Sequence, residues 1–255
     1  MRNKKIFILA ALIGLVFLLS GCTQVNEPIT AQSTGFWNKF FVYPMSSLIT
    51  YFAELFGTNY GLAIVIVTVI IRLVLLPLNV KQIKSSRAMQ EIQPELKALQ
   101  EKYKSKDANT QQKLQEETLA LFQKHGANPL AGCLPIFIQM PIFIAMYHAI
   151  MRTSAIKEGS FLWFQLGTPD YILPFIVAGA TYLQQRLMMA GSPATANNPQ
   201  FKVMLYVMPI MIGIFAFILP SALALYWVVG NIFMVAQTIF INKPMMKDAS
   251  TGGDE

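Results

Sequence analysis

Residues 61–80 constrain this chain most, because the stretch is long and apolar enough to cross a bilayer. Its twenty residues at helical rise extend about 30 Å, the thickness of the hydrocarbon core. Fourteen of them are Leu, Ile or Val, and only Arg72 is charged. An arginine at mid-span costs about 3 kcal/mol, whereas the aliphatic side chains together contribute about 4 to 8 kcal/mol. The stretch therefore predicts a transmembrane helix with a cation near the middle of the membrane.

Arg72 needs water or a partner at that depth. The spans expected in this chain contain no Asp or Glu, so they offer it no carboxylate. Thr68 and Asn79 share its helix face. One interpretation is an arginine that snorkels or binds backbone carbonyls. The other, which we favour because intramembrane charges are mostly functional, is a water-filled groove that offers positive charge to an incoming molecule.

The rest of the chain is also typical of an integral membrane protein. Of its 255 residues, 54% are hydrophobic, and the mean hydropathy is +0.46. At the start, Arg2, Lys4 and Lys5 precede a short apolar run at residues 6–19, which predicts a secretory signal peptide.

The residues that follow, Leu19-Ser20-Gly21-Cys22, resemble the bacterial lipoprotein box. The resemblance implies that residues 1–21 are removed and that the thiol of Cys22 is acylated. An uncleaved signal anchor with a chance cysteine is the alternative. Lipidation would leave Cys133 as the only free thiol, so we expect no disulfide within the mature chain.

The segments around the Arg72 span differ in composition. Residues 22–35 are polar and predict a lipid-anchored tether. Residues 36–60 hold nine aromatics and one apolar face, which predicts an amphipathic helix in the outer interface; simple packing of that face against the spans is the alternative, and the two are compatible. Residues 81–128 predict a charged cytoplasmic helical hairpin, whose nine Lys/Arg and six Asp/Glu suit acidic partners. Residues 242–255 predict a short cytoplasmic tail.

Four further apolar segments bring the predicted transmembrane helices to five within residues 61–241, so we expect an all-α membrane protein. The four segments are 130–151, 171–189, 203–219 and 222–241. With the amino terminus outside, the carboxyl terminus lies in the cytoplasm. The cytoplasmic side then carries thirteen Lys/Arg and the outer side three, which satisfies the positive-inside rule.

Polar side chains recur inside these spans. Each of them alone is explained by hydrogen bonding between helices. Together with an arginine that lacks a carboxylate partner, they predict one polar groove lined by several spans. The candidate groove residues are Arg72, Thr68, Gln139, Gln184, Trp227, Asn231 and Gln237.

Other chemistry finds no support in the sequence. There is no Gly-x-x-x-x-Gly-Lys motif, so no nucleotide-driven step is expected. The two histidines, His125 and His148, have no spaced ligand set for a metal. We therefore expect neither an enzyme nor a cofactor.

Three stretches resemble the YidC/Oxa/Alb family of membrane insertases. They are Asn128-Pro-Leu-Ala-Gly-Cys-Leu-Pro135 with Gln139-Met-Pro-Ile-Phe143, then Tyr182-Leu-Gln-Gln185, and Met208-Pro209 through Pro220 to Leu225-Tyr-Trp227 and Asn231. With the Arg72 span and the hairpin, the resemblance covers residues 36–241. The lipoprotein signal, without a large outer domain before the first span, is similar to the Gram-positive form of the family.

The resemblance implies an insertase and chaperone of the bacterial cell membrane, which acts alone or with the Sec translocon on nascent membrane proteins and lipoproteins. Arg72 matches the groove arginine, and Gln139, Gln184, Trp227 and Gln237 match positions that line or flank the groove. The hairpin matches the region that receives substrates. The implied partners are nascent chains, the Sec translocon and membrane lipids, with weak ribosome binding because the tail is short, and no DNA.

Two other functions compete with insertion. A small-anion transporter or channel would use Arg72 as its binding charge, but it predicts inverted repeats, which the sequence lacks. A passive lipoprotein scaffold leaves a mid-membrane arginine without a role.

Overall fold

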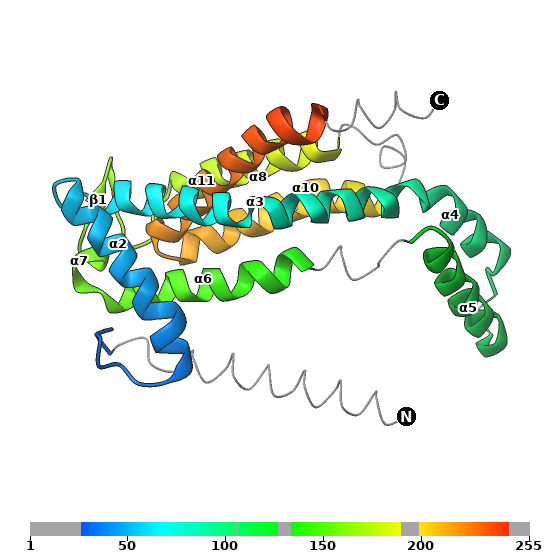
Figure 1. The fold of residues 1–255 in the computed structure, drawn as a ribbon. Coiled ribbons are helices and arrows are strands. Elements are labelled where there is room, and N and C mark those ends of the chain that lie inside the picture. The colour runs from blue at the N-terminus through cyan, green and yellow to red at the C-terminus, as the bar shows by residue number, and fades with distance from the viewer. Residues whose placement is uncertain (1–26, 106, 127–133, 190–198, 245–255) are drawn as a thin grey trace.

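The computed structural model describes residues 27–105, 107–126, 134–189 and 199–244, and most of them are helical, as expected. In chain order the elements are η1 (Asn38–Val42), α2 (Tyr43–Leu55), α3 (Tyr60–Glu91), α4 (Gln93–Lys102), α5 (Ala108–Lys124), α6 (Leu134–Arg152), α7 (Ser154–Lys157), β1 (Ser160–Phe161), β2 (Phe164–Gln165), α8 (Leu173–Met189), α10 (Pro199–Ile218), α11 (Ser221–Gln237) and η3 (Thr238–Asn242), where η marks a π-helical turn. Figure 1 shows an elongated bundle of α3, α6, α8, α10 and α11. We call the end that carries β1 and β2 the β end, and the end that carries α4 and α5 the hairpin end.

Two of the described helices are long and apolar enough to cross a membrane by length and composition, at Tyr60–Ser85 and Ser221–Asn242. They contain the expected spans 61–80 and 222–241. A shorter apolar helix, Val203–Ile218, falls on the expected span 203–219. That all five spans cross the membrane stays a prediction.

The central helix α3 continues as far as Glu91, well past the expected end of its span. Lys and Gln dominate the first residues after 80, and both are good helix formers, so nothing in the sequence stops the helix there. The expected hairpin region therefore begins as an extension of α3. Its two helices, α4 and α5, pack against each other.

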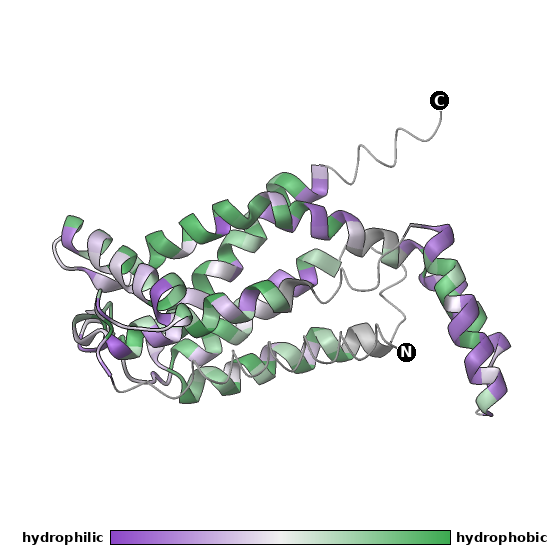
Figure 2. Ribbon diagram, turned by 60° about the horizontal axis from the view of Figure 1, so that its bottom comes forward, coloured by the Kyte–Doolittle hydropathy of each residue, from purple (hydrophilic) through white to green (hydrophobic). Residues whose placement is uncertain are grey.

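Side-chain contacts hold α4 and α5 together at both ends. Near the tip, the Tyr103 hydroxyl donates to a Glu117 carboxylate oxygen at 2.5 Å, and the Lys102 ammonium lies 3.3 Å from the same carboxylate. Near the base, the Glu95 carboxylate lies 3.1 Å from the His125 ring. Asp107 caps α5 by accepting a hydrogen bond from a backbone amide of the first turn. Figure 2 shows how hydrophilic this hairpin is beside the bundle.

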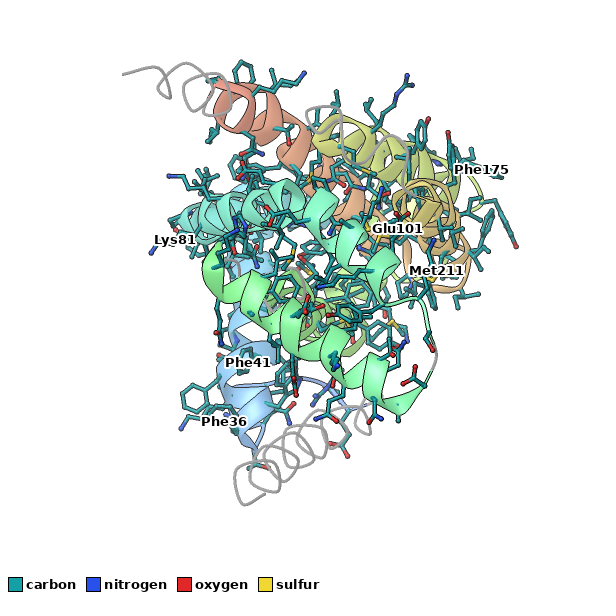
Figure 3. The ribbon with its side chains drawn as sticks, turned by 90° about the vertical axis from the view of Figure 1, so that its right-hand side faces the viewer. Phe36, Phe41, Lys81, Glu101, Phe175 and Met211 are labelled. Carbon is teal, nitrogen blue, oxygen red and sulfur yellow. The ribbon has the colours of Figure 1, made fainter. Side chains whose placement is uncertain are left out.

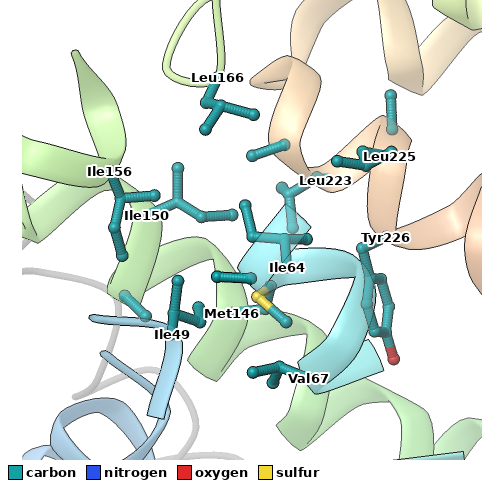
Figure 4. Close-up of a cluster of buried hydrophobic side chains, with 14 of the residues drawn as sticks. Ile49, Ile64, Val67, Met146, Ile150, Ile156, Leu166, Leu223, Leu225 and Tyr226 are labelled. Carbon is teal, nitrogen blue, oxygen red and sulfur yellow. The ribbon is translucent and has the colours of Figure 1, made fainter. Parts of the chain in front are cut away.

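The hydrophobic core lies toward the β end, where α2 crosses α3 and α6. Its large buried side chains come from α2, α3, α6, α7, α8 and α11 and from the segment around β2, and Figure 4 shows most of them. Ile49 of α2 and Ile64 of α3 are fully buried there. Helix α2 therefore packs against the bundle through its apolar face, and its expected place in the outer interface stays a prediction.

The segment before η1 is joined to the carboxyl end of α6 by Arg152, which is only 4% exposed. Its Nε donates to the carbonyl of Glu27 and its Nη1 to Oδ1 of Asn38, both at 2.7 Å. The amide of Ile29 donates to the carbonyl of Arg152 at 3.1 Å. The described part of the expected tether thus lies against α6.

Large apolar side chains project from the sides of the bundle. Figure 3 shows Phe36 and Phe175 pointing outward at different edges, and they are 63% and 70% exposed. Such exposure is costly in water but suits a protein whose sides face hydrocarbon.

Candidate functional site

Arg72 lies midway along α3 with its guanidinium against α11. A Cβ atom added to Gly230 would lie only 2.5 Å from Nη2 of Arg72, so the guanidinium lies against the backbone of α11 at this level. The guanidinium carbon lies 5.8 Å from the centre of the Tyr226 ring, within range of a cation–π interaction. The Nε atom is buried and has no hydrogen-bond partner among the described residues.

Tyr226 links this arginine to α6. Its side chain is fully buried, and its hydroxyl accepts a hydrogen bond from Nε2 of Gln139 at 2.7 Å. Arg72, Tyr226 and Gln139 thus form a contact chain across α3, α11 and α6. A buried tyrosine usually finds a partner for its hydroxyl, and here the amide fills that need.

The other candidates on α11 contact neighbouring helices. Trp227 stacks on Phe143 of α6, with ring centres 5.0 Å apart and planes at 24°. Asn231 donates from Nδ2 to Oγ1 of Thr181 on α8 at 2.8 Å. Both contacts are of the kind that joins helices inside membranes.

Three candidates stand apart from the arginine's contacts. The hydroxyl of Thr68 is fully buried and donates to the carbonyl of Ile64 in its own helix at 2.6 Å. Gln184 donates to the sulfur of Met188, one turn along α8. Gln237 is 3% exposed, and neither atom of its amide has a partner among the described residues.

The structure thus joins Arg72 and Gln139 through Tyr226 and places Trp227 beside them on α11. Sequence reasoning did not select Tyr226 or Gly230 for the site. Gly230 follows Tyr226 by one helical turn, so both share one face of α11. A glycine one turn from a polar aromatic was an available signal, because small residues in membrane helices mark close approach.

The structure bears only in part on two further predictions, the lipidation of Cys22 and the lack of a metal site. Cys22, the expected lipidation site, lies outside the described residues. Within the described part of the chain, no three His, Cys, Asp or Glu side chains are grouped so that they could hold a metal ion.

Comparison of the sequence with known proteins places this chain in a family. The sequence pattern of the family described as 60Kd inner membrane protein matches residues 51–249. The chain belongs to this family. Over 248 residues it is 67% identical to the membrane protein insertase YidC of Oceanobacillus iheyensis, covering 96% of this chain and 98% of the relative. Over 247 residues it is 60% identical to the membrane protein insertase MisCA of Bacillus subtilis, covering 96% and 94%.

A solved structure agrees with these relatives. The crystal structure of an active YidC insertase, with its first transmembrane domain resolved, superposes with a TM-score of 0.62 at 28% identity. The match covers 81% of this chain and 47% of the solved chain, so this chain corresponds to about half of that protein. The expected YidC-type family is therefore confirmed, and it is a family of membrane insertases rather than of enzymes.

Proposed function

We propose that this chain inserts membrane proteins into the bacterial cell membrane and helps them to fold, with Arg72 as the charge that attracts their polar ends. Its family and its 67% identity to a named insertase support this proposal. The single observation that carries the residue-level part is the guanidinium of Arg72, which is half-buried between α3 and α11 and has an Nε atom without a partner.

The charge of Arg72 remains available in this setting. All the ion pairs among the described residues lie in the hairpin, so none of them neutralises the arginine. The ring of Tyr226 is an attractive but neutral neighbour. A cation held in this way attracts an acidic or polar segment, as intramembrane arginines do in substrate pathways.

The mechanism requires no chemical fuel. A nascent segment enters a hydrated groove from the cytoplasm, and Arg72 draws its short polar tail partway across the membrane. The apolar segment then partitions into lipid, where burial of about twenty apolar residues supplies many kcal/mol. Gln139 and Trp227 border the path, and Gln184, Asn231, Thr68 and Gln237 lie on the helices that flank it.

The proposal includes a topology. Five spans place the hairpin and the carboxyl terminus in the cytoplasm, while acylated Cys22 anchors the amino terminus outside. The charge bias of the sequence supports this orientation. A cysteine at Lys102 should then resist labelling from outside intact cells, and palmitate should label the wild type but not Cys22→Ser. The Sec translocon, and more weakly the ribosome, are proposed partners through the family resemblance.

Photo-crosslinking to a stalled nascent membrane protein tests the proposal. A photoreactive residue at Gln139 or Trp227 should cross-link to the nascent chain. The control position is Phe36, which is 63% exposed. It lies two residues before the start of η1, away from the contacts of Arg72. Cross-links at Phe36 that equal those at Trp227 would contradict a path beside Arg72.

A further inference from the structure

The turn between β1 and β2 presents two large apolar side chains to the surroundings. The strands pair antiparallel with Phe161 opposite Phe164, so Leu162 and Trp163 form a two-residue loop between them. The side chain of Leu162 is 73% exposed and that of Trp163 is 53% exposed. We call these two residues the β tip.

The backbone of the β tip makes a leucine unusual at this position. Leu162 has a φ of 52°, which lies in the left-handed region. Two-residue loops between strands use such conformations and favour Gly, Asn or Asp there, because other side chains crowd the backbone. The leucine is also too exposed to stabilise the fold by packing. A bulky side chain that is held in an unfavourable conformation and left exposed indicates a contact with something outside the chain.

The strands below the β tip are packed onto the bundle. The side chain of Phe164 is only 4% exposed, and its ring meets the ring of Phe161 edge-on, with ring centres 6.0 Å apart. The ring of Phe161 lies directly against Gly61 at the start of α3, where there is no room for a Cβ atom. Figure 1 shows β1 beside this end of α3. The β tip is therefore fixed to the start of the helix that carries Arg72.

The composition around the β tip suits lipid. No charged residue occurs between Glu158 and Asp170 in the sequence. Tryptophan and other aromatic residues are enriched at the two interfaces of a bilayer, where their rings lie at the level of the headgroups. Just after β2, Tyr171 and Ile172 are 81% and 56% exposed, and they lead into the outward-pointing Phe175 of α8 (Figure 3). The exposed apolar surface of the bundle thus continues to the β end.

The distance along α3 from the β end to Arg72 fits a place at the bilayer interface. Arg72 follows Gly61 by eleven residues, which is an advance of about 16.5 Å along the helix. Half of the hydrocarbon core of a bilayer is about 15 Å thick. A β tip at the level of the interface therefore places Arg72 close to the middle of the membrane.

We propose that Leu162 and Trp163 insert into the bilayer interface at the β end and anchor the start of α3 there, so that the β tip sets the depth of Arg72 in the membrane. The partner of this surface is lipid, in the headgroup and upper acyl-chain region of one leaflet. The anchor acts on α3 through the contact of Phe161 with Gly61. The consequence for Arg72 rests on the proposed function, whereas the contact with lipid does not.

Fluorescence quenching in vesicles of phosphatidylcholine and phosphatidylglycerol tests the contact with lipid. The full chain with Cys133→Ser receives one added cysteine for the label NBD, and the signal without the added cysteine is subtracted. The label at Leu162→Cys should be quenched severalfold more by lipid nitroxides near the headgroup than by aqueous iodide. Glu158→Cys, at an exposed charged position four residues earlier, is the control and should be quenched more by iodide.

Iodide quenching of the Leu162→Cys label that equals that of Glu158→Cys would overturn the proposal, because it would place the β tip in water. The same result is expected of a tip that is made for a protein partner, since vesicles of the purified chain contain no such partner. Quenching by lipid nitroxides therefore separates the two kinds of contact.

A second measurement tests whether the β tip sets the depth of α3. The label at Val74→Cys, a position that is 72% exposed and two residues after Arg72, reports depth by its relative quenching by nitroxides near the headgroup and near the chain end. Leu162→Gly combined with Trp163→Ser should shift this ratio and preserve the melting temperature, because glycine accepts a positive φ. Leu119→Ser, which removes a 56% exposed side chain from α5, should not shift it. An unshifted ratio in the double variant would overturn the depth-setting role.

The outcomes also separate this proposal from the proposed function, because the quenching measurements need no substrate. A β tip in water, in a chain whose insertion of acidic tails still depends on Arg72, would remove the anchor alone. A β tip in lipid, in a chain whose insertion activity is indifferent to Arg72→Ala, would remove the groove-charge function alone.

Discussion

The guanidinium of Arg72 lies directly against the backbone of Gly230, where a Cβ atom would come within 2.5 Å of Nη2 and 3.2 Å of Cζ. The structure therefore has no room for a side chain at this point unless the arginine moves. Because the contact involves the far end of a long side chain, the arginine can move at modest cost. The position of the charge depends on this glycine.

Gly230→Ala should therefore displace Arg72 without unfolding the protein. Alanine has the higher helix propensity by about 1 kcal/mol, which offsets part of the strain. We expect the melting temperature to change by only a few degrees, while insertion of substrates with acidic tails falls severalfold. Gly179→Ala in α8 is the matched control, because a Cβ there meets nothing within 4 Å. Equal insertion by the two variants would contradict the dependence of Arg72 on Gly230.

Tyr226→Phe should destabilise the protein by about 1 kcal/mol, because it leaves the half-buried Gln139 amide without its partner. The aromatic ring that faces Arg72 is retained, so the insertion activity of the folded protein should be nearly unchanged while its melting temperature falls. Thermal unfolding in detergent measures the effect. Tyr206→Phe is the control, since the Tyr206 side chain is 56% exposed. Equal melting temperatures for the two variants would show that the hydrogen bond contributes nothing.

Arg152→Gln should release the segment before η1 from α6. The substitution removes two hydrogen bonds of a buried guanidinium, at a cost of about 2 to 3 kcal/mol. Limited proteolysis of the purified protein should then cleave residues 27–38 faster than in the wild type. Lys157→Gln, an exposed change nearby, should leave cleavage unaltered. A cleavage rate that Arg152→Gln does not alter would contradict the proposed attachment.

The hairpin should loosen in acid. The hydrogen bond from Tyr103, and then the one from Lys102, lower the pKa of Glu117 below its ordinary value of 4.5. A carboxylate with a lowered pKa stabilises the folded state above its unfolded pKa, and the contribution is lost as the pH falls through the folded value. Hydrogen exchange in α5, corrected for intrinsic rates, should therefore accelerate below about pH 4.5. Glu117→Gln should reduce this pH dependence, leaving the part that comes from the Asp107 cap, whose pKa is also lowered by its hydrogen bonds, whereas Glu116→Gln should preserve it in full.

Much of the helical architecture follows from local sequence patterns, because the composition of a segment and the spacing of its apolar residues can be read without knowing the rest of the fold. The helical character, the apolar stretch around Arg72 and the charged hairpin were predicted in this way. The end of α3 was not, because the change from apolar to charged residues after 80 marks a change of solvent and not the end of a helix. Lys and Gln continue the helix as readily as the aliphatic residues before them.

The site was predicted only in part, because its contacts join residues that are distant in sequence. The arginine was identifiable from its burial cost alone. That Thr68 bonds its own helix, and that Gln139 reaches Tyr226, depends on helix rotation and register. Arg152 looked like one of a few outer cations, yet it is buried and bonded to residues more than a hundred positions away. No pattern within α6 signals that contact.

The most direct test of the central claim measures insertion by Arg72 variants with two substrates that differ only in whether the translocated tail is acidic or neutral. Arg72→Lys should keep much of the activity, because the site requires charge more than the bidentate guanidinium. Arg72→Ala should leave the melting temperature in detergent unchanged or slightly raised, since a charge without a carboxylate partner is removed. Insertion of the acidic-tail substrate should then fall most. A lowered melting temperature together with an equal loss for both substrates would contradict the account and make Arg72 a structural residue.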